Sequence, residues 1–277
     1  MSVPANNGHP DAGLLEALHG EMVPKFLATL DESNNPNVVP IISLDAMQDG
    51  TLAFGELFIQ KTRRNLQNNP HVAAIVVTED LQIWTMRARF CGFEESGPRV
   101  EYLNDKNLFR YNAYLGVRRA VVFDSLKVTG TWKLSKLNVA AELIPARAWS
   151  MFSGKKGPTH IPARVAEKFA RTEAIKVIAF SGKEAYPEIL PAFSLLPAGA
   201  SMFFGTRIFR KNLSALAPGT RVAASVITTE PVAYQVKGTF SKSRITPGGR
   251  MGSIDIDEVF SASPPLVGER IAMHTGG

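Results

Sequence analysis

Short runs of apolar residues alternate with turn residues along most of this chain. The runs are rich in Val, Ile, Phe and Thr, which favour strands, and Asp49-Gly50 is a typical turn. In the first half the pattern predicts strands at 24–31, 37–44, 51–56, 71–78, 82–93 and 119–130. In the second half it predicts them at 174–181, 187–194, 200–205, 221–228, 231–242 and 253–260. Many short strands with few helices indicate a mainly β fold, a barrel or a sandwich.

Helical signals are few. Apolar spacing or a lack of strand alternation predicts short helices at 13–22, 62–69, 139–144, 162–171 and near 208–216. The third should end at Pro145, and the fourth has Pro162 near its first turn, where proline is tolerated. We expect a loop at 154–158, a turn at 248–252 and a loosely ordered tail after Pro265. The insert 97–118 fits a cover over one end of a barrel, and its polar and aromatic residues include Arg110, Tyr111, Asn112 and Tyr114.

The same order of signals occurs twice, in residues 24–90 and 174–240. Equivalent residues keep an offset of about 150: Pro36 and Pro187, Pro40 and Pro191, Gly55 and Gly205, Asn65 and Asn212, Trp84 and Tyr234. A repeat of this length indicates two copies of one domain rather than a solenoid. The length of 277 residues also suits about two domains. We therefore divide the chain into 1–134, a helical basic connector 135–171, and 172–277.

Composition narrows the class of protein. The chain is 45% hydrophobic and 20% charged, as in ordinary globular proteins. No apolar run approaches the roughly 18–20 residues that a membrane helix needs, and the first residues lack the pattern of a secretory signal. The single cysteine, Cys91, excludes an internal disulfide and suits a reducing compartment. We expect a cytoplasmic protein with no membrane partner.

The net charge of +6 is concentrated in the connector, because residues 135–171 carry seven basic and two acidic side chains. The sequence has no basic stripe interleaved with aromatic residues, so nucleic acid is not the expected partner. The charge indicates either a solvated linker or an anionic small molecule.

The segment 61–66, Lys-Thr-Arg-Arg-Asn-Leu, carries the most informative chemistry. The start of a short helix offers free backbone N–H groups, and Lys61, the Thr62 hydroxyl and a guanidinium would complete a cradle for a terminal phosphate. The alternative is a solvated basic helix face. Other motifs offer no competing site: the five histidines have no metal-ligand spacing, and neither a GxSxG elbow nor a P-loop occurs.

In this context the first half resembles the pyridoxamine 5′-phosphate oxidase-like split barrels, which bind FMN. The resemblance is carried by the strand 26–30, the segment 36–40 bounded by two prolines, the strand ending at Gly55, the segment 61–66 and Asn69-Pro70 with its following strand. It covers roughly 14–130 and, more weakly, 172–271.

The resemblance implies two fused split β-barrels that pair as an internal pseudo-dimer with FMN between them. Phosphate-holding positions would be Lys61, Thr62 and Arg64, and the strand along the isoalloxazine would be Pro40, Ile41, Ile42 and Ser43. Gly55, Asn65 and Trp84 complete the implied set. In the second half Ile208 and Phe209 replace the Lys-Thr pair, while Arg207 and Arg210 remain basic. One good site is therefore expected, with Arg207 and Arg210 marking a doubtful second one.

The implied function is an FMN-dependent oxidoreductase that acts on a small-molecule substrate with NAD(P)H or another reductant. No catalytic acid or base can be named from the sequence. Two alternatives remain: a non-catalytic flavin or haem carrier, and a reductase that uses a deazaflavin, whose longer acidic tail would meet the basic connector. Whether the pseudo-dimer pairs again as a homodimer is open.

Overall fold

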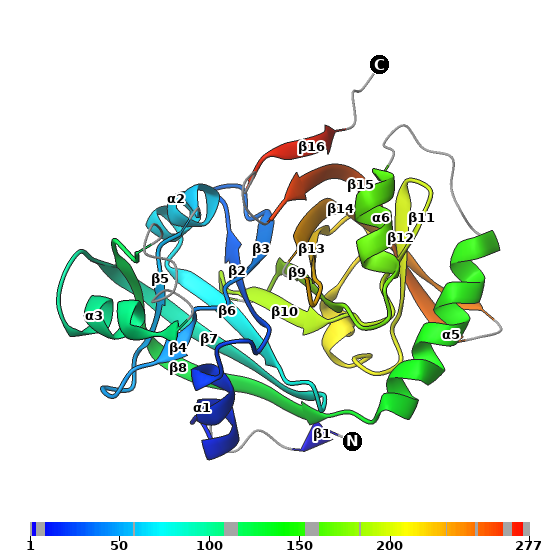
Figure 1. The fold of residues 1–277 in the computed structure, drawn as a ribbon. Helices are drawn as coiled ribbons and strands as arrows, with labels where there is room; N and C mark the ends of the chain where they lie inside the picture. The colour runs from blue at the N-terminus through cyan, green and yellow to red at the C-terminus, as the bar shows by residue number, and fades with distance from the viewer. Residues whose placement is uncertain are drawn as a thin grey trace.

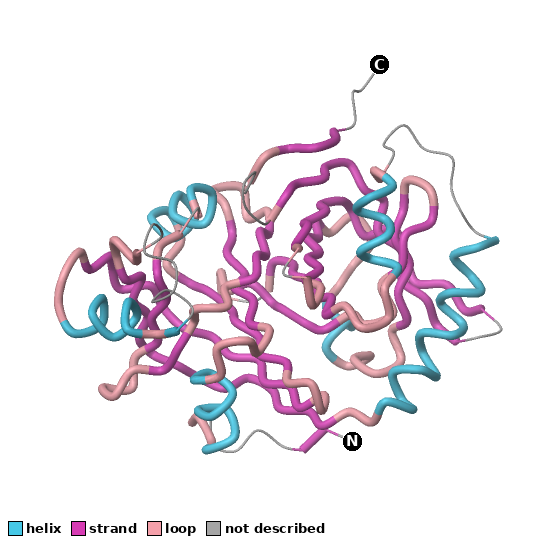
Figure 2. The backbone as a smooth tube through the Cα atoms, viewed as in Figure 1, coloured by secondary structure: helices cyan, strands magenta, loops and turns pink. Residues whose placement is uncertain are grey.

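Two antiparallel sheets of eight strands each are the main elements of the molecule (Figures 1 and 2). The computed structural model describes residues 2–3, 9–57, 59–107, 116–152, 161–182, 184–230, 232–246, 249–262 and 268–273. The first sheet contains β1 (Ser2–Val3), β2 (Lys25–Leu30), β3 (Pro36–Pro40), β4 (Asp45–Ala46), β5 (Leu52–Gly55), β6 (His71–Val77), β7 (Gln82–Glu94) and β8 (Ala120–Lys133). The second contains β9 (Ile175–Ser181), β10 (Pro187–Pro191), β11 (Leu196–Ala198), β12 (Ser201–Gly205), β13 (Arg221–Ile227), β14 (Ala233–Thr246), β15 (Gly249–Ser261) and β16 (Arg270–Met273).

The strand order of the first sheet, β3-β2-β6-β7-β8-β5-β4, recurs strand for strand in the second as β10-β9-β13-β14-β15-β12-β11. The short strands β1 and β16 pair with the equivalent strands β8 and β15. The duplication and the expected fold class, two fused split β-barrels, are therefore confirmed.

The helices lie around the sheets and also repeat. They are α1 (Ala12–His19), α2 (Gln60–Asn68), α3 (Pro98–Asp105), α5 (Lys136–Phe152), α6 (Ala163–Ala170) and the 3-10 helix η1 (Asn212–Ala215). Helix α1 packs on β4 and β6, and α6 packs on the equivalent strands β11 and β13. The buried pair Leu14 and Leu18 of α1 corresponds to Val165 and Phe169 of α6. The second copy thus has its own lead-in helix. The domain boundaries at 134 and 171 stay a prediction.

Two sequence predictions were wrong, one about the end of a helix and one about the C-terminal tail. Helix α5 continues through Pro145, where the sequence predicted its end. The carbonyl that a residue at 145 would normally bond belongs to Ala141, which is exposed, so water can satisfy it. The tail was expected to be loose, yet β16 pairs with β15. Because β12 pairs only with residues 251–255, the rest of β15 would otherwise leave an open edge.

The expected turn at 248–252 is also corrected, since β15 already begins at Gly249. Several other sequence predictions lie outside the described residues: the loop 154–158 and the insert residues Arg110, Tyr111, Asn112 and Tyr114. No helix among the described residues is long and apolar enough to cross a membrane.

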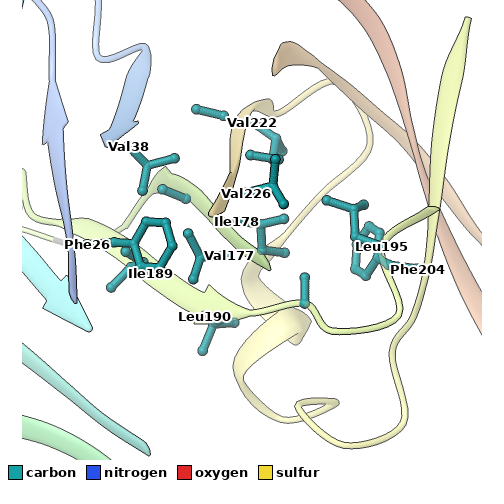
Figure 3. Close-up of a cluster of buried hydrophobic side chains, with 14 of the residues drawn as sticks. Phe26, Val38, Val177, Ile178, Ile189, Leu190, Leu195, Phe204, Val222 and Val226 are labelled. Carbon is teal, nitrogen blue, oxygen red and sulfur yellow. The ribbon is translucent and has the colours of Figure 1, made fainter. Parts of the chain in front are cut away.

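The two barrels share one hydrophobic core. Phe26 and Val38 of the first barrel pack in one cluster with Val177, Ile178 and Ile189 of the second (Figure 3). The contacting strands are β2, β3 and β6 on one side and β9, β10 and β13 on the other. Burial of this apolar surface holds the copies together as an internal pseudo-dimer.

Pseudo-symmetry creates two equivalent contact regions beside this core. In the first seam, α2 and β3 of the first barrel face β14 and β15 of the second. In the second seam, β10 and the segment before η1 of the second barrel face β7 and β8 of the first. The side chains that line the two seams differ in charge and polarity.

Candidate functional site

Lys61 places a positive charge in the first seam. It lies in the first turn of α2, and its ammonium nitrogen is 4.5 Å from the centroid of the Phe260 ring on β15. A cation over an aromatic face is attracted by the ring quadrupole, by about 0.5–1 kcal/mol at an exposed site. The Lys-Thr segment found from the sequence therefore points at the other barrel.

A second lysine, Lys237 on β14, lies next to Lys61 and is only 3% exposed. Burial and the neighbouring Lys61 lower the pKa of Lys237 well below the 10.5 of a free lysine. Glu258, opposite Lys237 in the strand register, opposes this shift. Glu258 is also shared with Arg221 at 3.6 Å and Arg270 at 2.6 Å. Arg221 also pairs with Asp257, and Asp31 opposes the shift of the Lys237 pKa as well, so the seam gathers four basic and three acidic side chains.

Below the lysines, buried polar side chains bridge the two barrels. Asn37 on β3 donates to the Thr62 hydroxyl at 3.3 Å. Gln235 on β14 donates to Asn37 Oδ1 at 3.3 Å and to the carbonyl of Val38. Asn65 donates to Thr29 within the first barrel at 2.9 Å. Because these groups are buried and satisfied, they fix α2 and β3 in register with β14.

Thr62 and Asn65 therefore have structural partners as well as their predicted place at the site. Thr62 is 2% exposed and its hydroxyl accepts from Asn37, although its own proton can still be donated. Arg64 is exposed, on the outer side of α2. The structure brings Lys61 and Thr62 into the first seam and leaves Arg64 at the surface.

The segment Pro40–Ser43 consists of the last residue of β3 and the three residues after it. The Ile41 amide donates to the Lys25 carbonyl at 2.8 Å, and the Ile42 carbonyl accepts from the Lys25 ammonium at 3.2 Å. Pro40 and Ile42 are half-buried, while Ile41 and Ser43 are buried. Lys25 therefore fixes this segment from beneath, and its pKa is lowered to about 8, chiefly by burial.

Two predicted residues lie elsewhere. Trp84 is 4% exposed in the core of the first barrel, and its indole donates to Asp11 at 3.3 Å, just before α1. A side chain at Gly55 would meet Val117 at 2.6 Å, so this glycine allows a close packing contact. Both residues pack within the first barrel, and none of the described contacts of Lys61 involves either of them.

The second seam is apolar where the first is cationic. Phe209, equivalent to Thr62, meets Trp132 edge to face with ring centroids 5.4 Å apart. Arg87, equivalent to Lys237, forms a 2.5 Å ion pair with Glu188 and lies over the Tyr186 ring. In this seam Arg87 is therefore paired with a carboxylate, and an aromatic pair stands where the first seam has Thr62.

Arg207 and Arg210, which marked the doubtful second site, lie at the surface of the second barrel. Both side chains are exposed, and the Arg207 backbone N–H donates to the Glu142 carboxylate at 2.8 Å. A carboxylate of the connector therefore bonds the backbone beside these arginines, and a second phosphate site at Arg207 and Arg210 stays a prediction.

Sequence reasoning missed Asn37 of the first copy and the half of the first seam that the second copy contributes: Gln235, Lys237, Glu258, Phe260 and Arg270. The repeat offset offered one signal, because it aligns Lys237 with Arg87 and Gln235 with Thr85. The sequence did not show, however, which face of each strand lines which seam.

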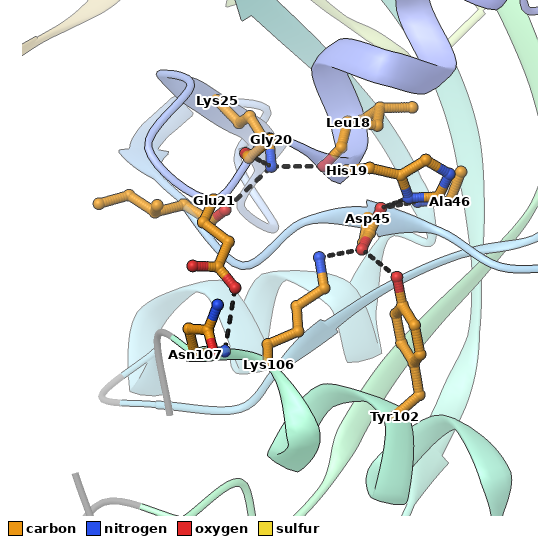
Figure 4. Close-up of polar contacts among 11 residues, drawn as sticks. Leu18, His19, Gly20, Glu21, Lys25, Asp45, Ala46, Tyr102, Lys106 and Asn107 are labelled. Carbon is orange, nitrogen blue, oxygen red and sulfur yellow. Dashed lines mark hydrogen bonds and ion pairs between the residues drawn. The ribbon is translucent and has the colours of Figure 1, made fainter. Parts of the chain in front are cut away.

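A separate polar cluster surrounds Asp45 at the far side of the first barrel (Figure 4). Asp45 is fully buried and accepts from His19 at 2.7 Å, from Tyr102 at 2.9 Å and from Lys106. These partners come from α1 and from the end of α3, so the carboxylate fastens both helices to β4. Leu196 occupies the equivalent position in the second copy, which has no counterpart of α3. Among the described residues no cluster of His, Cys, Asp and Glu is arranged to hold a metal ion.

No family model matches the chain, and no curated protein matches it. Solved structures do. HupZ from Group A Streptococcus is 16% identical with a TM-score of 0.36, over 46% of this chain and 95% of its own. An FMN-binding protein from Syntrophomonas wolfei subsp. wolfei is 20% identical with a TM-score of 0.34, over 45% and 88%. HutZ, the heme storage protein from Vibrio cholerae, is 17% identical with a TM-score of 0.32, over 45% and 94%.

These TM-scores are below 0.5, so the fold assignment above depends on the two matching strand orders and not on them. Each neighbour spans about half of this chain and most of its own length. The tandem arrangement of two barrels is shown by the chain's own two sheets, whose strand orders match.

Proposed function

We propose that the first seam binds FMN and that the chain is an FMN-dependent oxidoreductase acting on a small molecule. The observation that carries the proposal is the contact between Lys61 and the buried Lys237, which come from different barrels. Two ammonium groups side by side, one of them buried, are costly unless an anion neutralises them.

A phosphate group suits this arrangement. It accepts charge-assisted hydrogen bonds from both lysines, and the Thr62 hydroxyl can add its own proton. Binding a dianion also favours the protonated form of Lys237, whose pKa is lowered in the free protein. Phosphate binding should therefore be accompanied by proton uptake near neutral pH.

The ring system would lie along Pro40, Ile41, Ile42 and Ser43, where the half-buried side chains of Pro40 and Ile42 offer an apolar surface. When bound, the flavin would supply the redox chemistry. The chain's own residues orient it: Lys25 fixes the strand end, and Gln235 and Asn37 keep the two walls in register. NAD(P)H or another reductant as electron donor, a cytoplasmic location and further pairing of two chains stay predictions.

Haem is the main competing ligand, because one structural neighbour is a heme storage protein. Haem iron usually takes an axial histidine, cysteine, methionine or tyrosine. None of the described contacts of Lys61 and Lys237 involves such a residue, whereas two lysines suit a phosphate. A deazaflavin with a phosphorylated tail is compatible with the same pair, and the ligand test separates it from FMN.

The test is a fluorescence titration of apo-protein with FMN, comparing wild type, Lys61→Ala and Arg210→Ala. Lys61→Ala should weaken binding by about 10–100-fold, as expected when a charge-assisted bond is lost. Arg210→Ala is the matched control, because this exposed arginine lies in the other copy. It should change the affinity less than about twofold.

Equal losses in the two variants, or no FMN binding by wild type, would refute the site. A Soret band in the purified protein would assign it to haem, and tighter binding of a deazaflavin would assign it to that coenzyme. FMN binding without NAD(P)H oxidation in the presence of any acceptor would leave a flavin carrier and refute the oxidoreductase.

A further inference from the structure

The connector helix α5 inserts a carboxylate into the second barrel. Glu142 is 9% exposed, and its Oε1 accepts from the backbone N–H groups of Arg207 at 2.8 Å and Ile208 at 3.4 Å. The Ser194 hydroxyl adds a hydrogen bond, and the Arg207 guanidinium attracts the charge. Burial raises the pKa of Glu142, and these donors oppose the rise.

The loop is shaped around this group. A side chain at Gly205 would place Cβ only 2.1 Å from Glu142 Cγ, so the glycine leaves room for the carboxylate. Ser194 is buried and also accepts from the Gly205 N–H at 2.9 Å, which fixes its orientation. Consecutive backbone N–H groups, a buried hydroxyl and a nearby guanidinium together make an anion cradle.

The ligand of this cradle belongs to the connector, which occurs once in the chain, and not to the repeat. In the first barrel the equivalent glycine, Gly55, is covered by the apolar side chain of Val117. The Glu142 contacts also lie within two residues of Phe209, which meets Trp132 in the second seam. Glu142 therefore bonds the segment that carries Phe209 into the second seam.

We propose that Ser194, Gly205, Arg207 and Ile208 form a binding site for a small carboxylate and that Glu142 is its internal ligand. The Glu142 side chain beyond Cβ has the size of acetate, so the site should accept acetate when that side chain is removed. Because Glu142 is tethered, it competes at a high effective concentration and keeps free carboxylates out of the intact protein. The inference does not depend on which cofactor the first seam holds.

The test is chemical rescue of Glu142→Ala by acetate. The midpoint of thermal unfolding is measured in sodium acetate and in sodium chloride of equal ionic strength. Acetate should raise the midpoint of Glu142→Ala saturably, by about 2–4 °C. Wild type and Glu142→Gln, whose amide oxygen can still accept from both N–H groups, should show equal midpoints in the two salts. The double variant Glu142→Ala/Gly205→Ala, in which the new methyl fills the cradle, should not respond to acetate.

Equal midpoints of Glu142→Ala in acetate and chloride would overturn the proposal, and so would an equal response to propionate, which is one methylene longer. A response that persists in the double variant would also overturn it. If Glu142→Ala does not fold in chloride, the yield of folded protein on refolding replaces the midpoint. A yield in acetate no higher than in chloride would then count against the site, because a purely structural Glu142 predicts no rescue.

Discussion

Replacing Lys237 by methionine should stabilise the protein and abolish its binding of phosphate. Methionine keeps the apolar stem and removes the charge, which burial and Lys61 make costly. The pKa of Lys237 falls from 10.5 in the unfolded chain to about 7 in the folded protein. At pH 8 the unfolded lysine is protonated and the folded one largely neutral, so the cost is on the order of 3 kcal/mol.

The sign of the pH dependence follows from the same shift. Between about pH 7 and pH 10 the unfolded chain binds a proton at Lys237 that the folded chain does not, so the free energy of unfolding rises with pH. The expected slope from this one group approaches about 1.4 kcal/mol per pH unit. Lys237→Met should lack that contribution, and its advantage over wild type should shrink as the pH rises.

The assay is urea denaturation of both proteins at several values between pH 7 and pH 10, with FMN titrations alongside. Lys176→Met is the matched control, since Lys176 is also buried and its pKa is likewise lowered to about 7 by burial. Its ammonium donates to the Phe193 carbonyl at 3.3 Å, within the second barrel. It should stabilise the protein in the same way while leaving FMN binding intact. Parallel pH profiles of wild type and Lys237→Met, or a less stable Lys237→Met at pH 8, would refute the reasoning.

Two further substitutions test the polar cluster around Asp45 and the aromatic contact in the second seam. Asp45→Asn should lower the free energy of unfolding by about 3 kcal/mol in urea denaturation, because it leaves the buried Lys106 ammonium without its carboxylate; a loss below about 0.5 kcal/mol would contradict this role. Phe209→Ala should cost about 3–5 kcal/mol through the cavity it leaves against Trp132, and FMN binding to the folded variant should not change. Weakened FMN binding would show that the two seams are coupled.

The duplication could be predicted because each copy carries its turn signals at equivalent places. Pro36 and Pro187 begin β3 and β10, and Gly55 and Gly205 end β5 and β12. Such residues are selected by local backbone geometry, so a single sequence displays them. The apolar residues of the strands between them, which alternate with polar ones or form continuous runs, are likewise a local pattern that one sequence displays.

The site could be predicted only on the side where the sequence is contiguous. Lys61 and Thr62 lie in one segment, but Lys237 and Phe260 reach them through the packing of one barrel on the other. Trp84 was misplaced because an aromatic residue on a strand has the same pattern whether it packs in a core or lines a cleft. The role of Glu142 could not be predicted either, because a single acidic residue in a basic connector is ordinarily interpreted as exposed to solvent.

The two seams show what covalent fusion allows. In a dimer of identical chains, a twofold axis makes both crevices chemically the same, and any substitution appears in each of them. Here Phe209 stands at one crevice in the position that Thr62 holds at the other, and a helix present once per molecule bonds the segment beside only one of them. A tandem chain can therefore devote one crevice to holding itself together and keep the other for chemistry, so that a single flavin per polypeptide is the stoichiometry to expect.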